Sequence, residues 1–223
     1  MSRTLRIAGI GALSTAGITA TWLRVRSGWG STRFEQSKPL AGDDVIPAPR
    51  IQTTHAVTLD AHPGDVWQWL VQMGYHRAGW YTPEWVDQLW SVQNPSSEAV
   101  VDDLQTLRVG DRIPDGPPGT AFFDVVELDP YRAMVLHSMR HPISGIPPDL
   151  SNDRPGPYLD FSWSFVLEMA GVNRTRLLMR TRSNIYPAGM TRIAHILLVP
   201  IDVLMSRWML LGIKRRAETV LIH

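Results

Sequence analysis

The spacing of apolar residues changes along the chain, and each change marks a different element of secondary structure. Gln52 to Asp60 is rich in Thr and Val and alternates in part, which predicts a strand. His62 to Tyr81 then places Pro63 where the first turn of a helix accepts it. The apolar residues that follow have the spacing of one helix face: Val66, Trp69, Leu70 and Met73. A strand that leads into a short helix, ended by Gly74, is therefore the element around which the domain is organised.

Alternation with a period of two predicts a series of strands in the middle of the chain. A second short helix, Trp80 to Trp90, and a helical turn, Ala99 to Leu104, come first. The expected strands are Leu107–Ile113, Ala121–Leu128, Ala133–Met139, Tyr158–Met169 and Thr175–Ile185. The Pro-rich residues 140–157 are expected to form a long irregular loop, for which a lid is one hypothesis.

The C-terminal part of the chain, Met190 to Ile222, has the pattern of one long helix with a kink at Pro200. Within it, Ile193 to Ile213 is long enough to cross a membrane. The polar residues inside that stretch would be costly in lipid: His195, Asp202 and Arg207. A long helix packed on a sheet is therefore the preferred interpretation.

The N-terminal residues 1–26 contain an uncharged run, Ile7 to Leu23, with arginines on both sides. As a helix this run would be roughly 26 Å long, slightly shorter than a bilayer core. Three interpretations stay open: a membrane anchor, a cleaved signal, and a soluble helix or leader. Arginines at both ends leave the side of the membrane undetermined. Residues 27–50 have the composition of a surface linker, held to the domain by Trp29 and Phe34.

Composition excludes several classes of function. The formal net charge of +1 and a pI near 8.2 give no electrostatic case for nucleic-acid binding. The absence of cysteine excludes disulfides, thiol catalysis and Cys-ligated metals. The histidines lack metal-ligand spacing, and no Gly-rich phosphate loop follows a strand, so no metal or cofactor is expected. Nothing in the sequence indicates an oligomeric state.

Three motifs resemble the SRPBCC superfamily, which includes START domains and polyketide cyclases. They are the run Val66–Gly74, the segment Arg77–Tyr81 and Val109-Gly110-Asp111. The linker also has the Trp-Gly-x-Thr pattern, at residues 29–32, that similar members carry after an N-terminal hydrophobic segment. The resemblance covers about residues 51–222 and is to the bacterial polyketide-cyclase-like branch. It implies an α+β helix-grip fold over residues 51–223. In this fold a curved antiparallel sheet wraps around a long C-terminal helix and leaves an apolar cavity.

The resemblance implies a fold with an apolar cavity. We therefore expect the protein to bind a hydrophobic small molecule, lipid-like or polyketide-like, as its ligand. The expected ligand-binding residues are Trp80, Tyr81, Phe123, Trp163, Phe165 and Met179. The alternative is a cyclase or dehydratase acting on a poly-carbonyl precursor, with His137 and Tyr81 as acid and base and with Arg180 and Arg182 as oxyanion partners. A solvated outer face is the other interpretation of these two arginines. A third hypothesis is a membrane-associated module with a filled core.

Overall fold

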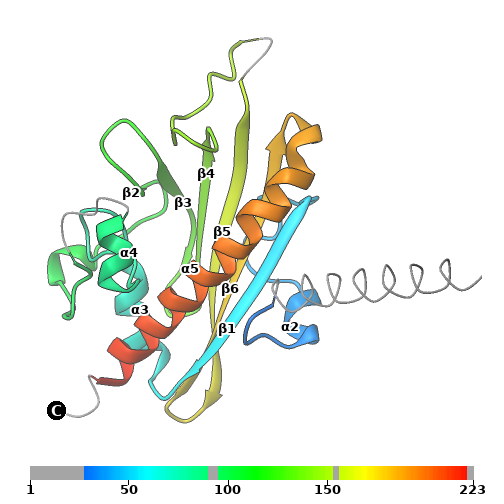
Figure 1. Cartoon of the computed structure of the whole chain (residues 1–223). Coiled ribbons are helices and arrows are strands. Elements are labelled where there is room, and N and C mark those ends of the chain that lie inside the picture. The colour runs from blue at the N-terminus through cyan, green and yellow to red at the C-terminus, as the bar shows by residue number, and fades with distance from the viewer. Residues whose placement is uncertain (1–27, 90–94, 153–155, 220–223) are drawn as a thin grey trace, which may run out of the picture.

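A computed structural model describes residues 28–89, 95–152 and 156–219. Six antiparallel strands form one sheet in the order β1-β6-β5-β4-β3-β2. The strands are β1 (Ile51–Leu59), β2 (Arg112–Pro114), β3 (Phe122–Asp129), β4 (Ala133–Arg140), β5 (Tyr158–Gly171) and β6 (Arg174–Tyr186). Helix α5 (Thr191–Thr219) lies across one face of this sheet (Figure 1). This is the helix-grip arrangement that the resemblance implied, so the predicted fold is confirmed.

The remaining helices are short. They are α2 (Arg33–Ser37), α3 (Pro63–Val71), α4 (Glu84–Leu89) and two 3-10 turns at Asp102–Leu104 and Ala188–Met190. Helix α3 follows β1 as predicted. Its His62 side chain accepts a hydrogen bond from the backbone N–H of Gly64, and Pro63 opens the first turn. At the other end, Arg77 donates to the carbonyls of Met73 and Val71, which have no partners within the helix.

The strand predicted at Leu107–Ile113 is shorter in the structure and begins only at Arg112. The preceding residues form a turn in which Asp111 accepts a hydrogen bond from the backbone N–H of Arg108, at 2.8 Å. Gly110 has a positive φ of 92°, which suits glycine and does not continue a strand. The alternation around Val-Gly-Asp was therefore a turn that leads into the strand.

Different segments of the chain pack on the two faces of the sheet. The inner face bears Leu136, Phe165 and Met179, which belong to one core with α3 and α5. Residues 28–50, here called the strap, lie on the outer face. Gly42, for example, sits so close to Val135 and Ser164 that an added Cβ would lie within 3 Å of both side chains. The strap is thus an ordered layer of the domain.

Helix α5 packs mainly against β1, β6 and α3. Lys214 donates to the carbonyl of Thr58 at 2.7 Å, and Asp202 accepts from Thr53 at 2.7 Å, so two polar contacts join α5 to β1. Within residues 28–89, 95–152 and 156–219, no helix is both long and apolar enough to cross a membrane. The run Ile7 to Leu23 lies outside the described residues.

Candidate functional site

The six residues expected to bind a ligand all lie in the inner core, but only two of them keep exposed surface. Tyr81, Phe123, Phe165 and Met179 are at most 2% exposed. Trp80 and Trp163 are partly buried. The structure therefore brings the six together, with four of them fully buried and two of them partly exposed.

The two partly exposed residues belong to a layer of aromatic rings centred on β5. Trp163 stacks on Trp80, with ring centroids 5.5 Å apart. Phe161, two residues before Trp163 on the same face, is also only partly buried and lies 5.9 Å from Phe123. Four rings thus form one layer on the inner face: Trp80, Phe123, Phe161 and Trp163. Helix α5 packs mainly against β1, β6 and α3 rather than against β5, the strand that carries Phe161 and Trp163.

A charged pair lies at the edge of the aromatic layer. The Arg140 guanidinium forms an ion pair with Asp115, and its Nε donates to Ser138 Oγ at 3.0 Å. The same guanidinium lies over the Phe123 ring, 4.4 Å from the centroid. Burial raises the pKa of the Asp115 carboxyl, and the Arg140 charge opposes that rise. Arg140 was not among the predicted site residues, although its place at the end of an apolar strand is visible in the sequence.

Hydrogen bonds fix Tyr81 in the core, which indicates a structural role. Its hydroxyl donates to the carbonyl of Trp69 at 2.8 Å, and its backbone N–H donates to Ser96 Oγ at 3.0 Å. Burial raises the pKa of the Tyr81 phenol above its usual range, so the group stays protonated. A phenol that is neutral and already committed as a donor is poorly placed to act as a base.

His137 lies on the other face of the sheet. It follows Leu136, an inner-face residue, along β4, so its side chain points outward. There its Nε2 is 2.8 Å from Asp160 Oδ1. The structure therefore does not bring His137 and Tyr81 together.

Arg180 and Arg182 also point outward, and the strap covers them. Arg180 is 2% exposed and donates to the Asp43 carboxylate, at 2.7 Å, and to the carbonyls of residues 35, 36 and 38. Arg182 donates to the carbonyl of Pro47 at 3.2 Å. Neither interpretation given from the sequence, a solvated face or an oxyanion site, describes Arg180, which holds the strap.

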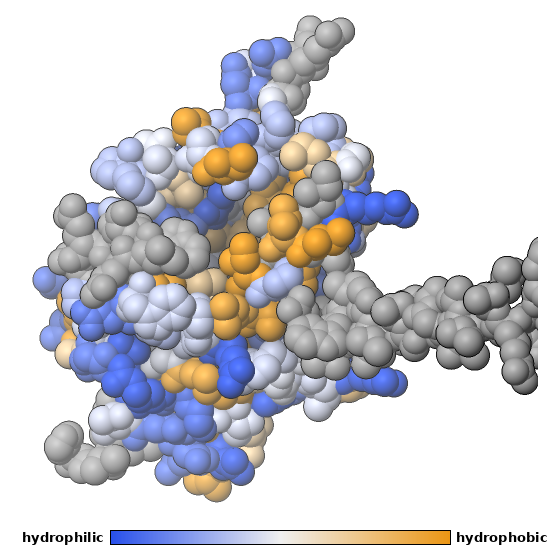
Figure 2. Space-filling model, in the orientation of Figure 1, coloured by the Kyte–Doolittle hydropathy of each residue, from blue (hydrophilic) through white to orange (hydrophobic). Residues whose placement is uncertain are grey.

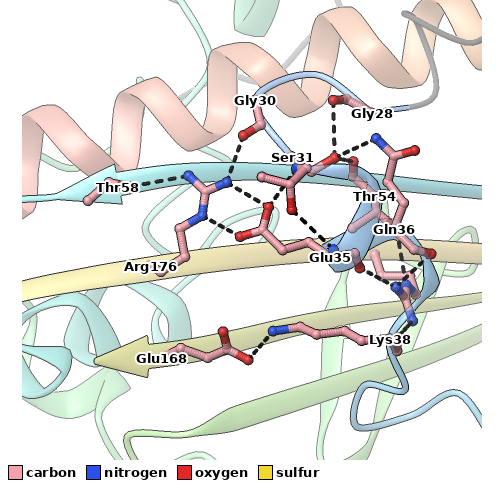
Figure 3. Close-up of polar contacts among 12 residues, drawn as sticks. Gly28, Gly30, Ser31, Glu35, Gln36, Lys38, Thr54, Thr58, Glu168 and Arg176 are labelled. Atoms are coloured by element: carbon pink, nitrogen blue, oxygen red, sulfur yellow. Dashed lines mark hydrogen bonds and ion pairs between the residues drawn. The ribbon is translucent and has the colours of Figure 1, made fainter. Parts of the chain in front are cut away.

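The start of the strap is attached to the free edge of β1. The carbonyl of Trp29 accepts from the N–H of Ala56, and the hydroxyl of Ser31 donates to the carbonyl of Thr54. Arg176 joins the carbonyl of Gly30 to the Glu35 carboxylate (Figure 3). These contacts cover an edge that would otherwise be open to pairing. Trp29 packs against the core as expected, whereas Phe34 is 72% exposed and does not hold the linker.

A buried polar cluster under α5 was missed in the sequence. His55 is fully buried, and its Nε2 is 3.1 Å from Asp202 Oδ2. Thr53 donates to the same oxygen and lies 2.6 Å from the hydroxyl of Thr181. Pairing of β1 with β6 and packing of α5 on β1 bring these residues together from three distant parts of the chain. They fix the position of α5 on the sheet.

Among the hollows that the described residues line, two lie apart from the aromatic layer. One, of about 690 Å³, lies toward the β3–β4 turn and includes Tyr131, Arg132 and Met169 in its lining. The other, of about 180 Å³, includes Arg77, Asp103 and Asp111. Neither includes any of the six expected ligand-binding residues.

Comparison with known proteins gives similarity in structure only. No protein-family model matches the sequence, and no curated protein does. A hypothetical protein from Helicobacter pylori is similar at 11% identity and a TM-score of 0.47, over 81% of this chain and 96% of that one. Norcoclaurine synthase from Thalictrum flavum is similar at 13% identity and a TM-score of 0.41, over 78% and 87% of the two chains. A protein from Mesorhizobium loti has 14% identity and a TM-score of 0.43, over 76% and 98%. Similarity this distant carries no argument about ligand or activity.

Proposed function

We propose that the chain binds a hydrophobic small molecule, lipid-like or polyketide-like, on the aromatic layer of the inner face, and sequesters or transfers it. One observation carries the proposal. Phe161 and Trp163 lie on an interior strand of the sheet and point to its inner face, yet both keep exposed surface, whereas the next inner-face residue, Phe165, is fully buried. An inner face that is left open and lined by aromatic rings is the kind of surface that apolar ligands occupy.

The polar atoms around this layer support a ligand that also has an oxygen-bearing end. Arg140 and Asp115 supply a cation and a carboxyl at the edge of an otherwise apolar surface. A few polar groups at the edge of an apolar site usually fix the orientation of the bound molecule. We further propose that residues 7–23 tether this domain to a membrane, which would place the site near a source of apolar ligands.

Native mass spectrometry of the full chain purified without detergent, followed by solvent extraction, tests the binding proposal. The expected result is one reproducible apolar mass per chain. Phe161→Gln should lower its occupancy, because a polar side chain in the open layer weakens apolar contact. Phe34→Gln is the matched control, since Phe34 is 72% exposed on the strap. Equal occupancy in the two variants, or a wild-type chain that is always empty, would contradict the proposal and favour a module with a filled core.

The alternative of a cyclase or dehydratase finds less support. Its two suggested acid–base groups, His137 and Tyr81, lie on opposite faces of the sheet. Turnover of a poly-carbonyl substrate that is lost in folded His137→Gln and Tyr81→Phe variants would restore this alternative.

A further inference from the structure

Helix α5 is apolar on the side that faces away from the sheet. Its buried side carries Val199, Met209, Leu210, Ile213 and Ala217. The exposed apolar residues, here called the α5 stripe, are Ile196, Leu197, Ile201, Leu204 and Leu211. Ile196 is 68% exposed and Leu197 is 59% exposed. Figure 2 shows the apolar surface that results over the middle and the N-terminal half of α5.

A helix segment that carries apolar residues on both its buried and its outward side is normally covered on both. Contiguous apolar surface exposed on a domain usually marks an interaction site. Within residues 196–211 only one carboxylate is present, Asp202, and it faces β1. The stripe therefore presents no negative charge to whatever covers it.

The rim of the stripe has the composition of a membrane interface. Trp85 is 56% exposed, and its ring meets that of Trp208 edge to face at 5.0 Å. Tryptophan is enriched where a protein meets the headgroup region of a bilayer. Arg192 and Arg207 are exposed on the same helix, where a cation can approach lipid phosphates.

The N-terminal part of the chain joins the domain beside this stripe. The guanidinium of Arg207 lies 5.6 Å from the centroid of the Trp29 ring. Residues 1–27 therefore connect to the domain next to α5. They include the uncharged run Ile7 to Leu23, which is flanked by arginines. A run that enters a bilayer would hold the adjoining stripe close to the same surface.

We propose that the α5 stripe rests on the surface of a lipid bilayer and acts as a second membrane contact beside the N-terminal run. The proposal relies on the tether of residues 7–23 and is independent of what the aromatic layer binds. A single lipid chain gives only marginal binding to a membrane and a second signal makes it stable, and the stripe would add to residues 7–23 in the same way. The stripe would also fix the orientation of the domain, with α5 and the adjoining opening of the inner face turned toward lipid.

The absence of cysteine from the chain permits a direct test on the full-length protein. Leu204→Cys places a single thiol on the stripe for an environment-sensitive fluorophore. Val172→Cys is the matched control, because Val172 is also apolar and is 87% exposed, at the β5–β6 turn. Both labelled proteins are mixed with vesicles of phosphatidylcholine and phosphatidylglycerol, and binding is followed by co-sedimentation. Brominated lipids in the same vesicles report contact by quenching.

The stripe label is expected to brighten about twofold on vesicle binding, since such fluorophores respond to transfer out of water. It should also be quenched by brominated lipid, while the control label changes in neither respect. In unlabelled protein, Ile201→Gln with Leu204→Gln should weaken vesicle binding by about tenfold, because two apolar contacts are lost. Val172→Gln should leave binding unchanged.

Three results would overturn the proposal, and they separate its parts. Vesicle-bound protein with an unresponsive stripe label would leave the tether and exclude the stripe. A stripe label that is already shielded without lipid would mean that the chain itself or a second copy covers α5, and light scattering would distinguish these two. Absence of vesicle binding would exclude both membrane contacts and leave the ligand measurement unaffected.

Discussion

At the scale of single residues, the outer face of the sheet depends on buried arginines. Arg180 donates hydrogen bonds to Thr54 on β1, to the Asp43 carboxylate and to three strap carbonyls. A guanidinium suits this site because its five N–H groups diverge in one plane, whereas an ammonium offers three at a point. The residue therefore connects the strap to the sheet through geometry as well as charge.

Arg180→Lys should lower the free energy of unfolding by about 2 kcal/mol, because several buried carbonyls lose a donor while the charge is kept. Arg174→Lys is the control, since the Arg174 side chain is 57% exposed in its pair with Asp60, and the change should stay within about 0.5 kcal/mol. Urea unfolding at neutral pH measures both. Equal stability of the two variants would show that the strap does not contribute to the folded domain.

Glu35 links the stability of the strap to pH. The pKa of Glu35 is lowered from 4.5 to about 2, mainly by the hydrogen bond from Arg176 and further by hydrogen bonds from Thr32. A carboxylate with a lowered pKa stabilises the fold above its unfolded pKa and loses that contribution as pH falls through the folded value. The stability difference between wild type and Glu35→Gln should thus be full above pH 4.5 and shrink toward pH 2. Urea unfolding across that range measures it, with exposed Asp44→Asn as control. A difference that stays constant would exclude the pair with Arg176 as its source.

At the scale of elements, a glycine in α5 allows this helix to pack closely against the neighbouring backbone. A Cβ added at Gly212 would lie 2.0 Å from the carbonyl oxygen of Tyr81. That oxygen belongs to backbone, which cannot move aside as a flexible side chain can. Gly212 therefore sets how closely α5 approaches the segment after α3.

Gly212→Ala should destabilise the domain by about 1–3 kcal/mol, as overpacking of a core does. This reverses the usual gain from replacing glycine by alanine inside a helix. Gly189→Ala, where an added Cβ meets nothing within 4 Å, should change stability by no more than about 0.5 kcal/mol. Thermal or urea unfolding compares the two. A stabilised Gly212→Ala would mean that α5 is held less closely than the structure shows.

The elements also show which features of the fold could be predicted from the sequence. Helix α3 and strand β5 were predicted closely because their apolar residues repeat with a clear local period. Helix α2 was missed, although Thr32 and Glu35 form a capping box that the spacing of the two residues signals. The cluster of His55, Thr53 and Asp202 had no local signal, since β1 and α5 are separated by most of the domain. The structure does not bring His137 and Tyr81 together as the enzyme hypothesis required. Alternation along a strand assigns residues to two faces, but it does not tell which of the two faces the helices cover.

At the scale of the whole molecule, the sheet separates two kinds of surface. The strap closes the outer face through charged and backbone contacts, and the inner face carries the apolar core with its open aromatic layer. The start of the strap lies at the edge between these surfaces, where Trp29 contacts β1 and α5. The two faces of the sheet are therefore built from different kinds of contact.

This separation predicts that changes on the two faces act independently. Arg180→Lys and Phe161→Gln lie on opposite faces and share no hydrogen-bond partner, so their effects on the free energy of unfolding should add within about 0.5 kcal/mol in the double variant. Arg180→Lys should also leave the amount of co-purified ligand per folded chain unchanged, whereas Phe161→Gln lowers it. Urea unfolding of the four proteins, with solvent extraction of each, measures both effects. A coupling above about 1 kcal/mol would show instead that the strap transmits its state through the sheet, because independent sites do not produce such an excess.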